Sequence, residues 1–308
     1  MTSVDPVTDA GERLLRHGDY AAVLTPVSAG IRLLQHRGTD LVVPYESGEV
    51  RPRYRGAILA PWPNRIVDGS YHFDGQDYRL PLTEPERQHA LHGLIGWTRF
   101  TAVHEDETSV TWMHQIVAQT GYPWSLELRV TYQLGTDGLT TSVHATNLSD
   151  FPAPYGVAPH PYLRIGDTKL DDCRLTAPAD QVLQVTPDRL IPQELASVEG
   201  TDFDFRSGRT IETTELDHAF TGLAAGSSGD VRVELQAPDG RGVGCSWDSA
   251  VLPWVQLHTA DSPGAPGHRG GLATEPMTCP PDAFNSGTDL IVLAPGASHT
   301  ASWSINAW

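Results

Sequence analysis

Lysine is nearly missing from this chain. Its 308 residues include one lysine, Lys169, which lies in the polar turn Gly-Asp-Thr-Lys-Leu. A P-loop requires Gly-Lys-Ser/Thr, and an enzyme that works through a Schiff base requires a lysine nucleophile. The sequence therefore excludes nucleotide kinases of the P-loop type and pyridoxal-dependent enzymes.

Positive charge in general is scarce. Lys+Arg 21 against Asp+Glu 38 gives a formal net charge of -17. A chain of this charge repels phosphate backbones and anionic lipid surfaces, so we expect no nucleic-acid partner and no membrane partner. The hydrophobic share of 39%, with only 19% charged residues, predicts a globular protein with a sizeable core.

The sequence also shows no signal for export and no cysteine pattern of a disulfide or metal site. The three cysteines, Cys173, Cys245 and Cys279, are far apart and form no CxxC pair, which argues against a disulfide framework and a zinc-cysteine site. The N-terminus has neither a basic nor an apolar signal region, and no run of about 18 apolar residues could span a membrane. We therefore expect a cytoplasmic protein in a reducing compartment.

Several catalytic signatures do not occur. The chain has no GxSxG for a serine hydrolase, no GxGxxG for nicotinamide binding and no HExxH for zinc. His89 and His92 have a metal-like spacing, but on a strand a separation of three residues directs two side chains to opposite faces. We predict neither a metal nor an organic cofactor, and a hydrogen-bonding role for His92.

A strong strand pattern is present instead. Residues 127–134, 139–145 and 231–237 alternate apolar with polar side chains, and Asp-Gly turns bound them. The 29 glycines and 24 prolines leave little room for helices, and residues 9–17 form the best helical candidate.

No linker or fixed-period repeat divides the chain. We therefore predict an all-β fold: a single large antiparallel β-sandwich over residues 1–308, with residues 1–10 as a flexible N-terminal tail.

Two residues have the setting of proton-transfer groups. Glu275 stands before Pro276 at a predicted strand end, where a rigid backbone would hold a base still. His160 is flanked by Pro159 and Pro161, which fix the direction of its ring. A solvated surface glutamate and a buried structural histidine are the alternatives.

Other polar residues have the setting of ligand-binding groups. Arg65 follows Trp62-Pro-Asn and could orient a ligand oxygen, with a surface ion pair as the alternative. Asp217 stands near Phe220, and a carboxylate beside an aromatic ring is a combination that recognises sugars. Tyr162 could add aromatic surface, although most aromatic residues are expected in the core.

These segments follow one another in a characteristic order. They are Asn64-Arg-Ile66 with Gly69-Ser-Tyr-His-Phe-Asp-Gly75, Leu91-His-Gly93, His160-Pro-Tyr162, Leu216-Asp-His218 and Glu275-Pro276. Over almost the whole chain they resemble the aldose 1-epimerase (galactose mutarotase) family, and the run from Glu275 to Phe284 is similar to a bacterial subgroup. The resemblance implies a large antiparallel β-sandwich, no metal, and an open cleft that binds a monosaccharide.

The resemblance also implies roles for individual residues. It implies Glu275 as general base, His160 as general acid, and Arg65, His92 and Asp217 as substrate-binding groups. Asn64 and Tyr162, which lie in the same motifs, complete the predicted binding set. The chain departs from the family at Pro159, where asparagine is usual.

The resulting hypothesis is an isomerase, an aldose 1-epimerase that interconverts the α and β anomers of a free aldohexose such as glucose or galactose, as a monomer or homodimer. Ionised Glu275 would accept the anomeric hydroxyl proton and keep His160 cationic, so that His160 could protonate the ring oxygen; this predicts a bell-shaped pH profile. Three alternatives stay open: a hexose-phosphate mutarotase, a glycoside hydrolase that uses Asp217 and Glu275 as its carboxylate pair, and a non-catalytic sugar-binding protein.

Overall fold

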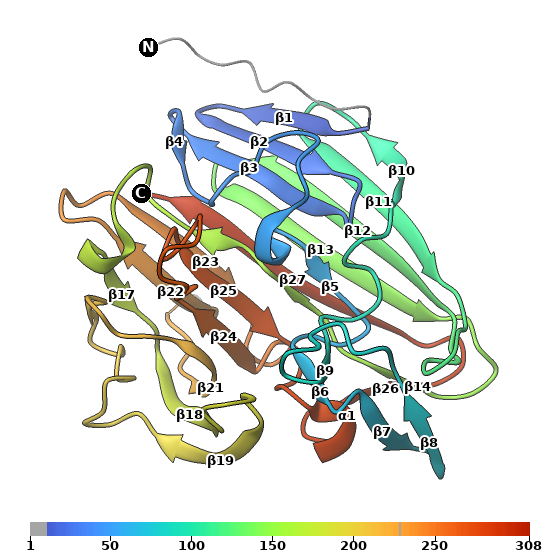
Figure 1. Ribbon diagram of the computed structural model, residues 1–308. Coiled ribbons are helices and arrows are strands. Elements are labelled where there is room, and N and C mark those ends of the chain that lie inside the picture. Colours follow the sequence, from blue (N-terminus) through green and yellow to red (C-terminus); the bar gives the residue numbers. More distant parts are fainter. Residues whose placement is uncertain (1–10, 228) are drawn as a thin grey trace.

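The protein is built from layers of antiparallel β-sheet (Figure 1), as a computed structural model that describes residues 11–227 and 229–308 shows. Within these residues the α-helical content is one short helix, α1 (Ala283–Ser286), together with the 3-10 turns η1 (Pro52–Tyr54) and η2 (Leu170–Asp172). The all-β fold predicted from the sequence is confirmed. None of the helices in the described ranges has the length and apolar character to span a bilayer.

The largest sheet has nine strands in the order β10-β11-β12-β13-β27-β23-β22-β17-β20. Their bounds are β10 (Thr101–Glu105), β11 (Ser109–Ile116), β12 (Leu126–Gly135), β13 (Gly138–Asn147), β27 (Ser298–Ala307), β23 (Gly242–Trp247), β22 (Val231–Gln236), β17 (Arg174–Thr176) and β20 (Arg209–Thr210). The three strands predicted from alternating side chains are β12, β13 and β22 of this sheet.

A second sheet has six strands in the order β16-β25-β24-β21-β18-β19. Their bounds are β16 (Tyr162–Leu163), β25 (Leu272–Met277), β24 (Trp254–His258), β21 (Asp217–Leu223), β18 (Ala179–Val185) and β19 (Pro192–Ser197). This sheet carries several of the polar residues singled out in the sequence.

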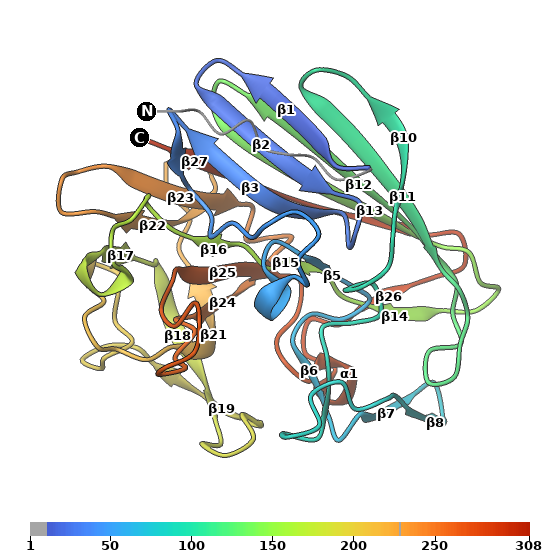
Figure 2. The same cartoon turned by 45° about the horizontal axis from the view of Figure 1, so that its top comes forward.

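A four-stranded sheet covers part of the large one, as Figure 2 shows. Its strands are β1 (Arg13–His17), β2 (Tyr20–Thr25), β3 (Gly30–His36) and β4 (Thr39–Asp40). Short pairs complete the fold: β5 (Ile58–Leu59) with β15 (Ala158–Pro159), β6 (Arg65–Val67) with β9 (His89–Leu91), β7 (Ser70–Phe73) with β8 (Gln76–Arg79), and β14 (Ala153–Tyr155) with β26 (Ile291–Leu293).

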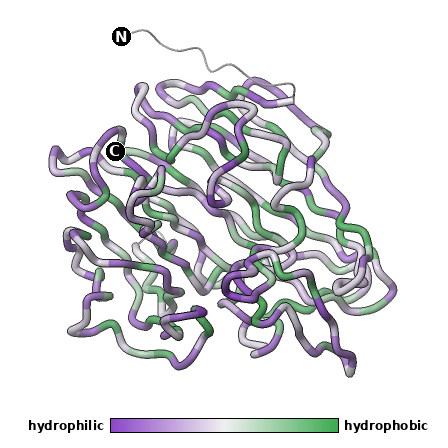
Figure 3. The backbone as a smooth tube through the Cα atoms, viewed as in Figure 1, coloured by the Kyte–Doolittle hydropathy of each residue, from purple (hydrophilic) through white to green (hydrophobic). Residues whose placement is uncertain are grey.

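The core lies between these layers and follows from the period of two. Along β12 the residues Leu128, Val130 and Tyr132 are fully buried, whereas Arg129 between them is exposed. Figure 3 shows hydrophobic and hydrophilic residues alternating along such strands. One contiguous cluster of buried apolar side chains includes residues of all three large sheets. Because each strand turns its apolar face toward this cluster, the shared core holds the sheets against one another.

The helix predicted at residues 9–17 is wrong. Residues 13–17 form β1, which pairs with β2, and Leu15 is buried while Arg16 is exposed. A short segment gains little from helix propensity alone, so pairing with a neighbouring strand and burial of one side chain decide its structure. Residues 9 and 10, and the tail predicted at residues 1–10, lie outside the described residues.

Candidate active site

The six-stranded sheet gathers polar side chains on one face. Gln256 of β24 pairs directly with Glu275 of β25, and His258 of β24 pairs with Asp217 of β21. Directly paired residues share a face, and so do residues two apart on one strand. The register of three neighbouring strands therefore places four polar groups side by side. Tyr162 of β16 joins them, because it pairs with Ala273, two residues before Glu275.

A second group of polar side chains comes from the β6–β9 pair. Asn64 and His92 adopt left-handed backbone conformations, with φ of 52° and 61°, and the His92 amide donates to the Asn64 carbonyl at 2.8 Å. Gly93 follows at φ 73°, and a Cβ at this position would lie 2.1 Å from the carbonyl oxygen of Ala60. Only glycine allows this close approach, which holds the His92 backbone in place.

The two groups enclose a polar cavity of about 310 Å³. All seven residues predicted as catalytic or substrate-binding line it: Asn64, Arg65, His92, His160, Tyr162, Asp217 and Glu275. The structure therefore brings together residues that are up to 211 positions apart in the sequence, from Asn64 to Glu275. Their catalytic and binding roles stay a prediction.

His160 and Glu275 face each other in this cavity. The His160 Nε2 lies 3.4 Å from the Glu275 Oε1, and the two residues are only 4% and 2% exposed. Backbone bonds to Ala57 and Gly56 hold His160 on both sides, at 2.9 and 2.8 Å. The Tyr162 ring stacks on the imidazole, with centroids 5.1 Å apart. The imidazole and the carboxyl group are thus held in one geometry.

Burial sets the protonation of this pair. Burial raises the pKa of the Glu275 carboxyl well above its usual range, and the negative charge of Asp217 adds to the effect. Burial also lowers the pKa of His160 to about 3, with a further contribution from His258. Both shifts favour neutral groups, so the proton of the pair resides on Glu275. This reverses the charged pair expected from the sequence, because removing water penalises both charged forms.

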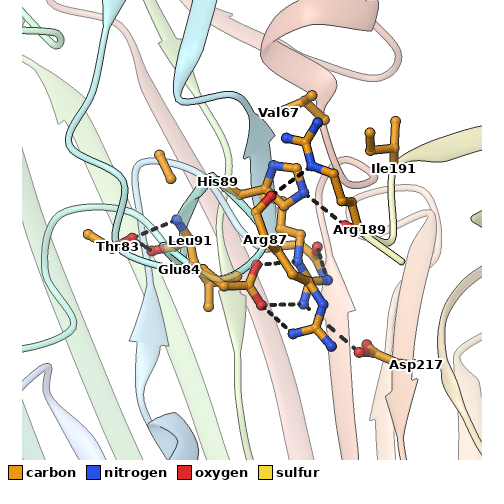
Figure 4. A network of polar contacts seen from close by, with 12 residues as sticks. Val67, Thr83, Glu84, Arg87, His89, Leu91, Arg189, Ile191 and Asp217 are labelled. Atoms are coloured by element: carbon orange, nitrogen blue, oxygen red, sulfur yellow. Dashed lines mark hydrogen bonds and ion pairs between the residues drawn. The ribbon is translucent and has the colours of Figure 1, made fainter. Parts of the chain in front are cut away.

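Arg65 owes its orientation to Glu84, which lies in the loop before β9. The Arg65 Nε and Nη2 donate to the two Glu84 carboxylate oxygens at 2.7 and 3.0 Å, and Arg87 donates to the same carboxylate at 2.9 Å. Figure 4 shows Glu84 beside Arg87, with Asp217 across from them. Burial opposes ionisation of Glu84, but the hydrogen bonds and positive charges of Arg65 and Arg87 together outweigh it and lower the pKa of this carboxyl. A bidentate guanidinium held in this way points in a defined direction.

Asp217 is the ionised carboxylate of the cavity. Its Oδ1 accepts a hydrogen bond from the Gln256 amide at 2.7 Å, and its Oδ2 lies 3.9 Å from both Arg65 and His258. Burial by itself raises the pKa of Asp217, but His258 and Arg65 together lower it below its usual value. The two cavity carboxyl groups therefore differ. At Asp217 the effects of His258, Arg65 and Gln256 outweigh the cost of burial, whereas at Glu275 the cost of burial and the negative charge of Asp217 prevail.

Several buried polar atoms at this cavity have no hydrogen-bond partner among the described residues. They include His92 Nδ1, His160 Nδ1, Gln256 Oε1 and Glu275 Oε2. Buried polar atoms are normally paired, because an unpaired one costs about 1–3 kcal/mol. Donors and acceptors spread around a cavity of this size fit a small ligand with several hydroxyl groups.

Further cavity residues were not predicted from the sequence. They are Arg53, Tyr54, Glu84, Glu86, Arg87, Leu91, Gln256, His258, Asp261 and Ser262. A signal existed for Gln256 and His258, since in the run Trp254-Val-Gln-Leu-His they alternate with buried apolar residues and so share a polar face. Glu84 had none, because its role depends on contacts with residues that only the fold brings near. Among the described residues no cluster of histidine, cysteine or carboxylate side chains could hold a metal ion.

Comparisons with known proteins identify relatives of this chain. The family model described as aldose 1-epimerase matches residues 14–306. The uncharacterized protein YihR of Escherichia coli K12 is 36% identical over 292 residues, which cover 94% of this chain and 91% of YihR. The aldose 1-epimerase of the same organism is 28% identical over 203 residues, 60% of this chain and 58% of that enzyme.

Solved structures show the same fold. The homologue of GalM/aldose epimerase from C. elegans superimposes with a TM-score of 0.86 at 22% identity and covers 97% of this chain and 98% of its own. The galactose 1-epimerase from Lactobacillus acidophilus does so with a TM-score of 0.80 at 18% identity, over 96% and 94% of the two chains. The fold and the family match together define an isomerase of the β-sandwich type that acts on carbohydrates. This chain belongs to the aldose 1-epimerase family.

Proposed function

We propose that this protein interconverts the α and β anomers of a free aldose, with glucose and galactose as the first substrates to test, through proton transfer by Glu275 and His160. The observation that carries the proposal is the 3.4 Å contact between the two side chains inside a polar cavity large enough for one sugar ring. Both side chains line this cavity, so both could reach a bound sugar.

The chemistry needs two proton transfers. In ring opening, the carboxylate of Glu275 accepts the proton of the anomeric hydroxyl while the imidazolium of His160 donates a proton to the ring oxygen, and the bond between C1 and that oxygen breaks. The open-chain aldehyde then rotates about the bond from C1 to C2. Closure on the other face returns the proton from Glu275 to the new anomeric hydroxyl and the proton of the attacking hydroxyl to His160.

The neutral pair corresponds to the open-chain stage of this sequence, so the proton of the pair has to pass from Glu275 to His160 before a ring can open. Ring opening converts a carboxylate and an imidazolium into a carboxylic acid and a neutral imidazole, so the pair holds one proton throughout. The raised pKa of Glu275 and the lowered pKa of His160 favour the neutral distribution, which is the one that accompanies the open-chain aldehyde. Burial thus stabilises the state in which the ring is open.

The other cavity residues hold the sugar. Arg65, aligned by Glu84, would donate to ring-side oxygens, and the ionised Asp217 would accept from a hydroxyl further round the ring. His92 lies with its ring centroid 5.0 Å from that of His160 and would donate or accept beside the reacting oxygen.

Polarimetry on freshly dissolved α-glucose and α-galactose tests the proposal. Wild-type protein should accelerate the approach to the anomeric equilibrium, and Glu275→Gln should slow the enzyme-dependent rate by about 100- to 10,000-fold. Glu127→Gln on β12, which does not line the cavity, is the matched control. If the protein releases reducing sugar from an oligosaccharide but does not accelerate the mutarotation of free aldoses, the proposal is wrong and the protein is a glycoside hydrolase.

A second candidate substrate is an aldose with an acidic group, such as a hexose 6-phosphate. The observation that favours it is Arg53, which lines the cavity but forms no ion pair with a carboxylate among the described residues. Arg65 and Arg87, by contrast, both pair with Glu84. Arg53 and Tyr54 also have left-handed φ angles of 49° and 55°, and backbone strain of this kind concentrates at binding sites.

The two substrate classes are separated by comparing kcat/KM for glucose, glucuronic acid and glucose 6-phosphate. If Arg53 binds an acidic group, wild-type protein prefers an acidic sugar, and Arg53→Gln lowers kcat/KM for that sugar about tenfold while leaving glucose unchanged. Arg37→Gln, on an exposed arginine paired with Asp19, is the control. Equal values for all three sugars would leave the neutral aldose as the substrate.

A further inference from the structure

The cavity has a support that lies outside it. The loop between β18 and β19 contacts the loop before β9 and the first residue of that strand, about a hundred residues away in sequence. The ring of His89 donates from Nε2 to the Arg189 carbonyl at 2.8 Å, and the Arg189 Nε donates to the Arg87 carbonyl at 2.9 Å. Arg189 also forms an ion pair with Asp68. We call these three residues, Asp68, His89 and Arg189, the clasp; Figure 4 shows Arg189 next to His89 and Arg87.

Local bonds hold the clasp in its conformation. The Arg189 amide donates to the Asp188 carboxylate at 2.9 Å, and Ile191 donates to the Thr186 hydroxyl at 3.1 Å. His89 is fully buried, and the Asp68 amide donates to its Nδ1 at 3.4 Å. A backbone carbonyl thus faces one ring nitrogen of His89 and a backbone amide faces the other, which holds the ring in one orientation.

The segment that the clasp holds is the one that aligns the cavity arginines. Backbone hydrogen bonds of 3.0 and 3.2 Å join Glu84 to His89 in both directions, and the Arg87 amide donates to the Glu84 carbonyl at 3.2 Å. Residues 84–89 therefore form one hydrogen-bonded unit. This unit carries the Glu84 carboxylate, which accepts hydrogen bonds from both Arg65 and Arg87.

The clasp also joins two sides of the cavity. β18 belongs to the sheet that carries Asp217 and Glu275, whereas the unit 84–89 belongs to the side that carries Arg65. Across the cavity itself these sides meet in the contact between Arg65 and Asp217, 3.9 Å long. A contact of that length is too long for a hydrogen bond, so it fixes the separation weakly. None of the three clasp residues lines the cavity.

We infer that Arg189 is a positioning residue for sugar binding, which acts through the Arg87 carbonyl and Glu84 to hold Arg65 at the correct distance from Asp217. This inference rests on the proposed function, since it assigns the role to the same cavity. Arg189 does not touch the substrate. Its removal should let the unit 84–89 shift and so weaken substrate binding more than it slows proton transfer between Glu275 and His160.

The test is a comparison of Arg189→Ala with Arg206→Ala. Arg206 is also partly exposed and pairs with two aspartates, Asp180 and Asp204, but it contacts neither the unit 84–89 nor the cavity. Arg189→Ala should raise KM for the preferred aldose about tenfold with kcat within about twofold, and Arg206→Ala should change neither. Arg189→Lys, which can reach one of the two partners, should give an intermediate KM.

A double-mutant cycle with Glu84→Gln separates positioning from general stability. If Arg189 acts through Glu84, then Arg189→Ala adds little to KM once Glu84→Gln is present. Additive effects of the two substitutions, or a KM for Arg189→Ala equal to that of Arg206→Ala, would overturn the inference. Asp68→Asn is a milder variant for use if Arg189→Ala folds poorly, because Arg189 can still donate to the Arg87 carbonyl. Asp68→Asn should raise KM less than Arg189→Ala does.

Failure of the clasp and failure of the proposed function give different results. If wild-type protein shows no mutarotation with any aldose, the proposed function fails, and the clasp is then tested by calorimetry with galactose as the probe. In that case Arg189→Ala should weaken galactose binding relative to Arg206→Ala. If wild-type protein is active and Arg189→Ala has unchanged KM, the clasp alone fails.

Discussion

Gln256 connects the two carboxyl groups of the cavity. Its side-chain amide donates to Asp217 at 2.7 Å, while its backbone pairs directly with that of Glu275 on the neighbouring strand. Gln256 therefore helps to keep Asp217 ionised at a fixed place beside Glu275. This hydrogen bond adds to the larger effects of His258 and Arg65, so that an ionised carboxyl group lies beside one whose neutral form is favoured by burial. Acid–base enzymes use such a combination to assign different roles to two carboxyl groups.

The charge of Asp217 should set the pH range of activity. That charge raises the pKa of both Glu275 and His160, and the active pair carries one proton. Asp217→Asn lowers both pKa values, so both limbs of the profile of kcat/KM against pH should move to lower pH. Polarimetric rates over a series of buffers from acidic to alkaline pH measure the shift. Asp239→Asn, in an exposed turn where Asp239 pairs with Arg241, should leave the limbs in place.

Glu275 and His160 should act as one unit. Ring opening needs both proton transfers, so losing either group removes most of the catalysis that the pair provides. Glu275→Gln, His160→Asn and the double variant should therefore show mutarotation rates within about tenfold of one another. His144→Asn, on β13 outside the cavity, controls for the loss of a histidine. Multiplicative losses in the double variant would show that the two groups act independently.

Glu84 should stabilise the fold as well as the site. Glu84→Gln removes the negative charge that pairs with the buried guanidinium of Arg65, which should lower the free energy of unfolding by about 3 kcal/mol at neutral pH. The pKa of Glu84 is lower in the folded protein than its usual value. The stabilisation that Glu84 provides is therefore complete above the pKa that this glutamate has in the unfolded chain. It is lost as the pH falls through the lower pKa that Glu84 has in the folded protein.

Urea unfolding of both proteins at neutral pH and at a pH below the usual pKa of a glutamate measures this contribution. The difference between wild-type protein and Glu84→Gln should narrow at the lower pH. A constant difference would mean that Glu84 titrates alike in the folded and unfolded chains.

Gly93 should tolerate no side chain. Gly93→Ala would place its Cβ against the Ala60 carbonyl oxygen, in addition to the cost of its positive φ. Gly75 has a similar φ of 77°, and a Cβ there would meet no atom within 4 Å, so Gly75→Ala carries the conformational cost alone, about 1–2 kcal/mol. Thermal unfolding should show Gly93→Ala to be the less stable variant. Equal melting temperatures would mean that the Ala60 segment yields without cost.

Much of the fold and of the site was predictable from local patterns. The alternation in residues 127–134 reports a strand because a pleated backbone buries every second side chain. Glu275 and His160 stand next to prolines, and Arg65 and His92 lie in short motifs, so their placement in one cavity was predictable from the family resemblance. The helix predicted over residues 9–17 failed because strand pairing outweighs weak local propensity in so short a segment.

The order of motifs and the period of two are properties of the sequence itself. They led to the fold class, the family and the seven residues predicted for the site, while the near absence of lysine excluded two classes of enzyme. The tertiary structure alone decided which carboxyl group of the cavity is ionised, how Glu84 aligns two arginines, and how Arg189 joins the two sides. These features depend on burial and on contacts between segments that are remote in the sequence. Desolvation and Coulomb interactions act through space, so neither can be read from neighbours along the chain.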